Sequence, residues 1–524
     1  MRLGDGGREL VARSGQQEKQ VYWESRLRKI LSPLPLYNVL IVSWALESAR
    51  QGRLKAAAKH IEVLGTAEDY RLLGKFFIPP HNVDSVVNER LTYGPDDAYS
   101  RRILDLRTWG AAAKLFNTYN GLANSESVLD FHGSEIMEAM PRLFWPQYDW
   151  QIGYDNLPRI TKAWMLYATA EAKKAFHSKH GVELDTLTQV AFSIYCATEE
   201  FPAIRVPHLL KNGIDANTVV QVLNAIGGTF EQQSRFAQEI RNISLPRDFR
   251  RSVVKERPLF LAWDRNSAII VVPSRDLLLR RITEGLYFDC VQDSASRNAA
   301  AAAFEGLCKV MLEHYCSPAC KIESERHTSY GMSADLFLHS EAENFEIIAE
   351  CKSRRLPQAV LTSPNPWMSS PEYFQDIIKG VVQVWRTKQE FSSTSPRKSY
   401  GLIITYDPWT ALGNTYIREI FREAHKLADK FAVSQEFRIP VISVDYTDLE
   451  RCLALFSISD LKEAINRSTE EKLHGYFLYG ILEEIGAVRK PREERMPYDK
   501  LISGRLPWWD NLNSSASEGP SHQR

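Results

Sequence analysis

The chain has 524 residues, which is too many for a single hydrophobic core, so we expect two to four domains. Its 65 basic and 65 acidic side chains cancel, which excludes a histone-like protein that binds nucleic acid through bulk charge. A local basic surface remains compatible with phosphate binding.

The seven cysteines are odd in number and lack the spacing of a disulfide framework, which indicates a reducing compartment. Cys316, Cys320 and the nearby His314 have poor spacing for a zinc knuckle, so we do not expect zinc. The first residues lack the apolar core of a signal peptide, and the longest apolar run, near residues 36–46, is too short to span a bilayer. We therefore expect a cytoplasmic protein without membrane contact.

In chain order, residues 1–20 are polar and contain glycines, so we expect a disordered or frayed N-terminus. Residues 21–245 carry apolar side chains at helical spacing between prolines, which predicts a mainly helical accessory or recognition region. Within it, residues 209–226 loosely resemble a helix-turn-helix, but ordinary helical packing explains the same pattern and is the preferred interpretation.

Residues 246–294 are predicted to form a basic linker, a β-hairpin and a helix. The linker belongs to a basic segment, residues 241–257, for which a solvated connector and a phosphate-contacting rim are equally compatible interpretations. Two β-prone runs, residues 259–263 and 268–272, predict the hairpin, and a helix is expected over residues 274–287.

Residues 295–450 alternate between helical and β-prone patterns. An alanine-rich helix is predicted for residues 296–315, and residues 320–323 form the first candidate strand. Residues 334–338 and 345–352, separated by a polar turn, predict a β-hairpin.

This hairpin brings three charged side chains together. Strand alternation places Glu350 and Lys352 side by side, about 7 Å apart along the strand, and turns Cys351 to the opposite face. Asp335, on the partner strand, reaches the same place. Carboxylate oxygens hold a hard cation such as Mg²⁺, which activates water, and an ammonium group positions that water and stabilises the transition state. We expect the metal at Asp335, Glu350 and the main-chain carbonyl of Cys351.

This segment resembles the PD-(D/E)xK nuclease superfamily, within it the branch of Mrr-like restriction enzymes and Holliday-junction resolvases. The motifs that carry the resemblance are Phe304-Glu305, the Gly331 to Asp335 segment, and Glu350-Cys351-Lys352. The residue before the aspartate is Ala334 rather than proline, at a position that varies in the superfamily. The resemblance implies an αβββαβ restriction-endonuclease-like core, a mixed sheet flanked by helices, with Glu305 as an auxiliary catalytic glutamate.

Residues 371–388 predict the helix that follows the hairpin, with Gln375, Lys379 and Gln383 as a polar stripe. In related nucleases a Gln or Lys on this helix leans into the active site, which makes Gln383 the first candidate and Lys379 the second. A solvated stripe is the alternative. Some related nucleases have a tyrosine four residues after the glutamine, where this chain has Thr387.

A local excess of basic residues follows the catalytic strand, although the chain as a whole is neutral. Arg354 and Arg355 come directly after Lys352 and are expected, with Lys379, to contact phosphates beside the cleavage site.

The rest of the chain continues the α/β pattern. Strands are predicted at residues 401–405 and 440–444, with a helix over residues 415–431 between them. Residues 451–506 predict a helical C-terminal extension, and residues 507–524 a disordered tail that begins with two tryptophans.

We therefore expect a Mg²⁺-dependent endonuclease, with Mn²⁺ as a substitute, that hydrolyses phosphodiester bonds in DNA during restriction, phage defence or repair. No P-loop motif is present, so an ATPase or other defence partner would be a separate chain, and a homodimer is also compatible. One alternative is a nuclease-fold protein that binds DNA or a partner without cutting. The other is an RNA-directed nuclease, because a metal-activated water does not require the 2′-hydroxyl.

Overall fold

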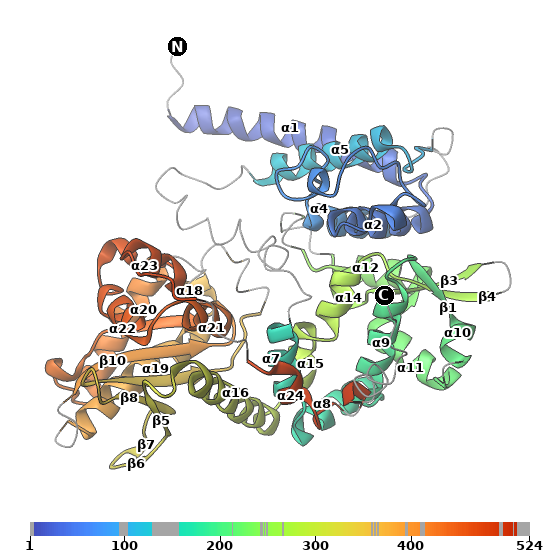
Figure 1. Cartoon of the computed structure of the whole chain (residues 1–524). Helices are drawn as coiled ribbons and strands as arrows, with labels where there is room; N and C mark the ends of the chain where they lie inside the picture. The colour runs from blue at the N-terminus through green and yellow to red at the C-terminus, as the bar shows by residue number, and fades with distance from the viewer. Residues whose placement is uncertain are drawn as a thin grey trace. The chain divides into compact units, whose positions relative to one another are not determined.

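The chain forms two compact units, and each is described by itself (Figure 1). Unit 1 contains the described residues up to 127 and Phe176–Asp289, and unit 2 contains Leu157–Ala175 and the described residues from Cys290 onward. The units do not follow the predicted division at residues 245 and 294. The computed structural model describes residues 5–93, 103–127, 157–211, 213–241, 245, 247, 250–264, 267–357, 360, 363, 366–392, 397–408, 414–491, 496–506 and 508–510.

Unit 1 begins with helices that pack around α2 (Leu36–Arg50). This helix is buried along most of its length because its sequence, LYNVLIVSWAL at the start, is almost wholly apolar. α1 (Asp5–Leu31) lies along α5 (Trp109–Ser127). A glycine permits this close approach, because a Cβ added to Gly121 would lie 2.6 Å from the ring of Trp23.

The expectation of a frayed N-terminus over residues 1–20 is wrong from Asp5 onward, where α1 begins. Arg, Glu, Gln and Lys dominate this stretch, and these residues have high helix propensity, so a helix continues through a polar sequence. Residues 1–4 lie outside the described residues.

Unit 1 also contains a four-stranded sheet with the strand order β1–β4–β3–β2. β3 (Leu259–Asp264) and β4 (Ser267–Val271) form the hairpin that the sequence predicts, and β1 (Ala203–Arg205) and β2 (Gly227–Thr229) flank it. The flanking strands have three residues each, too few for a periodic signal. The other helices are α3 (Leu54–Ala57), η1 (Glu68–Tyr70), α4 (Pro80–Tyr93), α9 (Leu184–Ala197), α10 (Val206–Lys211), α11 (Ala216–Ile226), α12 (Phe230–Glu239), α13 (Val253–Glu256), α14 (Arg275–Arg281), η5 (Glu284–Leu286) and α15 (Tyr287–Cys290).

The basic segment is not a solvated linker at Arg247, whose side chain is 2% exposed. Its guanidinium lies 2.8 Å from Glu24, 3.2 Å from Glu89, and in contact with Glu126. Its main-chain N–H donates to Glu126 at 3.0 Å. Carboxylates from α1, α4 and α5 thus hold this arginine inside unit 1, where a buried charge requires paired partners, and its charge is not offered to a phosphate.

Unit 2 is a mixed α/β unit built on a five-stranded sheet with the order β11–β10–β9–β8–β5. Its first strand in the chain pairs antiparallel with the second and the second antiparallel with the third, whereas the last three strands are parallel. The prediction of an α/β fold with a mixed sheet is confirmed at this level. The strands are β5 (Lys321–Ser324), β8 (Leu336–Ser340), β9 (Phe345–Lys352), β10 (Lys398–Thr405) and β11 (Val441–Asp445).

Helices cover both faces of this sheet. α19 (Pro371–Glu390) and α20 (Asn414–Lys430) form a core with Ile348 on one face. α16 (Ser294–Cys316) contacts the same strand through Cys351, as expected from strand alternation. The other elements are β6 (His327–Thr328), β7 (Gly331–Met332), α18 (Pro366–Ser369), η7 (Gln435–Phe437), α21 (Tyr446–Leu455), α22 (Ile458–Arg467), η8 (Glu471–Leu473) and α23 (Leu478–Glu484).

A helix from the first half of the chain completes unit 2. α7 (Leu157–Tyr167) packs against α16 and α24 (Tyr498–Ile502), and Figure 1 draws it in green beside the red α24. The ring centroid of Trp164 lies 5.3 Å from that of Trp508 and 5.8 Å from that of Trp509. These two tryptophans are therefore packed, contrary to a disordered tail from residue 507. The chain then crosses to unit 1 within α8 (Ala170–His180).

Among the described residues, no single helix combines the length and apolar character needed to cross a bilayer. The bent helix pair of residues 17–31 and 36–50 meets the same criterion by length and composition.

Candidate active site

The site lies where β8 begins and β9 ends. Leu336 pairs with Ala349, so Asp335, the residue before β8, comes next to Glu350 and Cys351. The Oδ2 atom of Asp335 accepts a hydrogen bond of 2.6 Å from the N–H of Cys351. The structure thus brings Asp335 to the strand that carries Glu350 and Lys352.

Glu350 and Lys352 point to the same face of β9, toward α19. The Nζ atom of Lys352 donates to Oε1 of Glu350 at 2.5 Å, and the two side chains are 25% and 8% exposed respectively. Both pass over Gly380, where an added Cβ would lie 3.2 Å from Cε of Lys352 and 3.4 Å from Cγ of Glu350. A glycine inside a long helix costs about 1 kcal/mol relative to alanine, and here the missing Cβ lets both side chains pass close to α19.

Burial dominates the electrostatics of the site. It raises the pKa of Glu350 to about 7, opposed by Lys352 and supported by Asp335. Burial also raises the pKa of Asp335, opposed by the N–H of Cys351 and by Lys352. Burial alone would lower the pKa of Lys352, but Glu350 and then Asp335 raise it instead. The site therefore contains two carboxylates whose charged forms are destabilised by burial, and one ammonium group that stabilises them.

These residues fit a divalent cation. Oε2 of Glu350 is buried and has no hydrogen-bond partner among the described residues. The N–H and C=O of a strand residue point to the same edge, so the carbonyl of Cys351 faces the side where Asp335 lies. Within the described part of the chain, no three His, Cys, Asp or Glu side chains are grouped to hold a metal. A cation here would use two carboxylates, this carbonyl and water, which suits Mg²⁺ because it retains several waters.

Glu305, on α16, lies close enough to Asp335 for their charges to interact. Burial and, after it, the charges of Asp335 and Glu325 together raise the pKa of Glu305 to about 7, opposed by Lys309. Glu325, which follows β5, also raises the pKa of Asp335. Glu325 was not predicted from the sequence, because an exposed glutamate after a short strand carries no signal that identifies it.

Gln383 contacts the main chain that leads into Asp335. Its Nε2 atom donates to the carbonyl of Met332 at 2.7 Å and to that of Ser333 at 3.1 Å. One turn later, the hydroxyl of Thr387 accepts a hydrogen bond of 2.9 Å from the N–H of Ala334. Gln383 and Thr387 therefore position the aspartate through its preceding residues. Of the two, Thr387 was not predicted as a site residue. It occupies the position at which some related nucleases have a tyrosine.

The three residues predicted to contact phosphate differ in whether their charged groups are exposed. Arg355 is buried and its Nε atom donates to Asp407 at 2.8 Å, so it does not present its charge at the surface. Arg354 donates to Asp376 at 2.9 Å and lies 4.2 Å from the ring centre of Tyr373, with its side chain partly exposed.

Lys379, the remaining predicted phosphate contact, is exposed on α19. It directly precedes Gly380, over which Glu350 and Lys352 pass. Its charge therefore lies at the surface beside the site.

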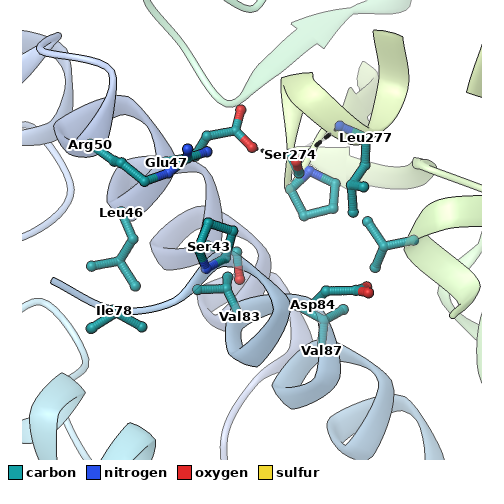
Figure 2. Close-up of a pocket in the computed structure, with 13 residues that line it drawn as sticks. Ser43, Leu46, Glu47, Arg50, Ile78, Val83, Asp84, Val87, Ser274 and Leu277 are labelled. Atoms are coloured by element: carbon teal, nitrogen blue, oxygen red, sulfur yellow. Dashed lines mark hydrogen bonds between the residues drawn. The ribbon is translucent and has the colours of Figure 1, made fainter. Parts of the chain in front are cut away.

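A cavity of about 30 Å³ in unit 1 does not compete with this site, because its polar groups already serve the fold (Figure 2). Glu47 contacts the hydroxyl of Ser274 and accepts from the N–H of Arg275 at 2.8 Å, so it satisfies the first turn of α14. Asp84 accepts from the hydroxyl of Ser252 at 2.5 Å. The walls are otherwise mostly apolar: Leu46, Ile78, Val83, Val87, Val254 and Leu277.

Comparisons with known proteins identify no relative. No protein-family model matches the chain, no curated protein matches its sequence, and no solved structure matches its fold.

Proposed function

We propose that unit 2 is a metal-dependent phosphodiesterase that cuts DNA within the strand. The observation that carries the proposal is the meeting of Asp335, Glu350 and Lys352 at the joint end of β8 and β9. Apart from the separate β6–β7 hairpin and the four-residue α18, the order of elements from α16 to β10 is one helix, three strands of the five-stranded sheet, one helix and one strand. This order is compatible with the αβββαβ core that the resemblance to PD-(D/E)xK nucleases implies.

The proposed roles follow from the position of each group. Asp335, Glu350 and the carbonyl of Cys351 would hold Mg²⁺, which when bound supplies Lewis acidity and lowers the pKa of water. Glu350 keeps the ammonium of Lys352 at the strand end, where Lys352 orients the attacking water and stabilises the added negative charge of the transition state. Glu305, with its pKa raised to about 7, is suited to exchange a proton near neutral pH.

DNA is the proposed substrate because exposed basic groups adjoin the site. Arg354 follows Lys352 by two residues, and Lys379 is exposed on the helix that covers the site. Such groups contact phosphates and orient the duplex without reading its sequence. Restriction, phage defence and repair are the processes that use an enzyme of this kind. Since one such site cuts one strand, a double-strand break would require a second copy of the chain.

A cleavage assay with the full chain tests the proposal. Labelled double-stranded, single-stranded and branched DNA, and RNA, are incubated with Mg²⁺ or Mn²⁺. Asp335→Asn and Lys352→Ala should each lower the rate of metal-dependent cleavage by about 10³-fold or more while the protein stays folded. Lys426→Ala, which removes an exposed lysine that pairs with Glu423 on α20, is the matched control and should cleave like the wild type.

The outcomes separate the alternatives. Cleavage that persists unchanged in both variants would overturn the assignment of the site. Cleavage of RNA alone would show that the same site acts on RNA and not on DNA. Reproducible DNA binding without products under any metal would favour a nuclease-fold binding protein.

A further inference from the structure

Lys162 is a buried lysine of α7, far in sequence from the catalytic strands. Its side chain lies within unit 2 and the residue is only 4% exposed. A buried ammonium is stable only where acceptors or opposite charges surround it, so its contacts identify what it holds in place.

The main contact is with Tyr406, the residue that follows β10. Nζ of Lys162 donates to the main-chain carbonyl of Tyr406 at 3.1 Å and lies 4.3 Å from the centre of the same residue's ring. The ring centroid of Phe304, on α16, lies 5.8 Å from that of Tyr406. Tyr406 is thus fixed by its carbonyl and by its ring.

The main-chain N–H of Tyr406 is hydrogen-bonded to the catalytic strand, β9. It donates to the carbonyl of Lys352 at 3.0 Å, one step beyond the pairing of Thr405 with Lys352. The two peptide groups of Tyr406 therefore connect the ammonium of Lys162 to the main chain of Lys352. This hydrogen bond joins the end of β9, where the strand carries Glu350 and Lys352, to the segment after β10.

The charges at these strand ends give Lys162 a second role. Asp445, at the end of the neighbouring β11, is buried, and burial raises its pKa while Lys162 lowers it. Asp407, two residues after β10, is paired with Arg355, whose guanidinium lies 5.5 Å from the ring centre of Tyr406. Lys162 and Arg355 are thus the cations that balance two acids around Tyr406.

We propose that Lys162 is a positioning residue of the active site: α7, through this side chain, holds the end of β10 so that the main chain at Lys352 is fixed. This inference rests on the proposed function for its catalytic part, while the contact itself can be tested without any activity. Since a displacement of about 1 Å in a reacting group costs up to about 100-fold in rate, a partial loosening should cost about 10-fold.

The experiment compares Lys162→Met, Lys162→Arg and the control Lys174→Met in the full chain. Lys174 is an exposed lysine of α8 and lies, like Lys162, in the Leu157–Ala175 part of unit 2. Lys162→Met should lower kcat about 10-fold and leave KM within about 2-fold, because the substrate-contacting groups remain. Lys162→Arg keeps a charge and donors and should recover most of the rate. A purely structural role would change the amount of folded protein and not the kcat of the folded fraction.

Hydrogen–deuterium exchange provides the activity-independent measurement. Peptides that contain Tyr406 should exchange faster in Lys162→Met, while peptides from α2 in unit 1 and from α20 should exchange as in the wild type. If Lys162→Met folds, cleaves with the wild-type kcat and protects the Tyr406 amide fully, the proposal is overturned. If Lys162→Met unfolds, a folded Lys162→Gln variant takes its place, and wild-type kcat together with full protection of the Tyr406 amide in that variant overturns the proposal equally. A wild-type chain that cleaves nothing refutes the proposed function, and the exchange result then decides separately whether Lys162 holds this strand end.

Discussion

Gly380→Ala is a perturbation whose size follows from three contacts. The added methyl group would lie 3.2 Å from Cε of Lys352, 3.4 Å from Cγ of Glu350 and 3.4 Å from Cδ1 of Ile403. Alanine gains about 1 kcal/mol of helix propensity over glycine, and overpacking a buried site costs about 1 to 3 kcal/mol. The free energy of unfolding should therefore fall by about 0 to 2 kcal/mol.

The effect on catalysis should exceed the effect on stability. The 3.2 Å contact is relieved only if the side chain of Lys352 moves by a few tenths of an ångström, and this side chain is held in its bond to Glu350. We expect kcat to fall about 10-fold with little change in KM. Steady-state cleavage of a labelled duplex measures kcat, and urea unfolding measures stability.

Gly306→Ala supplies the matched control, because Gly306 lies in α16 and an added Cβ meets no atom within 4 Å. This variant should gain up to about 1 kcal/mol and keep the wild-type kcat. If Gly380→Ala is stabilised like Gly306→Ala and cleaves at the wild-type rate, the close packing of α19 against the catalytic pair does not limit the reaction.

Two further predictions concern the same site. Burial raises the pKa of Glu350 from 4.5 to about 7, so the folded chain binds this proton more tightly than the unfolded chain, and stability is lost as pH rises through this range, by at most about 3 kcal/mol. Urea unfolding in EDTA at pH 5 and pH 8 should show a larger loss in the wild type than in Glu350→Gln, in which Glu305, whose pKa is also raised to about 7, still contributes; equal pH dependence in both would exclude the effect of Glu350. Thr387→Val leaves the N–H of Ala334 without its acceptor, which should cost about 1 to 3 kcal/mol in thermal unfolding and lower kcat, whereas wild-type values for both would show that this bond does not position Asp335.

Local patterns were sufficient to predict the centre of the site. The alternation over residues 345–352 and the polar turn before it determine which side chains share a face and which residues pair across the hairpin. The sequence therefore predicted that Glu350 and Lys352 lie side by side and that Asp335 approaches them. The residues that support them from α19 were only partly predicted. Gln383 was named for the catalytic centre but bonds the main chain, and a glycine within a helix is too common to single out Gly380.

Long-range pairing could not be predicted from one sequence. An arginine or lysine looks the same in the sequence whether its side chain is buried or solvated. Which of the two it is depends on the acidic partners that the fold brings to it. Arg247 looked like part of a linker because Glu126, one of its acids, is 121 residues away. Arg355 looked available to phosphate because its pairing with Asp407 depends on how β9 and β10 align. The same reason concealed Lys162, which lies in a helical region that carried no chemical motif.

The division of unit 2 between two parts of the chain also sets the order in which it can form during synthesis. α7 is buried from Arg159 to Tyr167, yet Tyr406, to which Lys162 bonds, is made 244 residues after it. At about 5 to 20 residues per second, Tyr406 is made roughly 12 to 50 seconds after Lys162. The contacts of α7 with Trp508 and Trp509 come later still. A nascent chain that ends before Trp508 therefore lacks these contacts of α7.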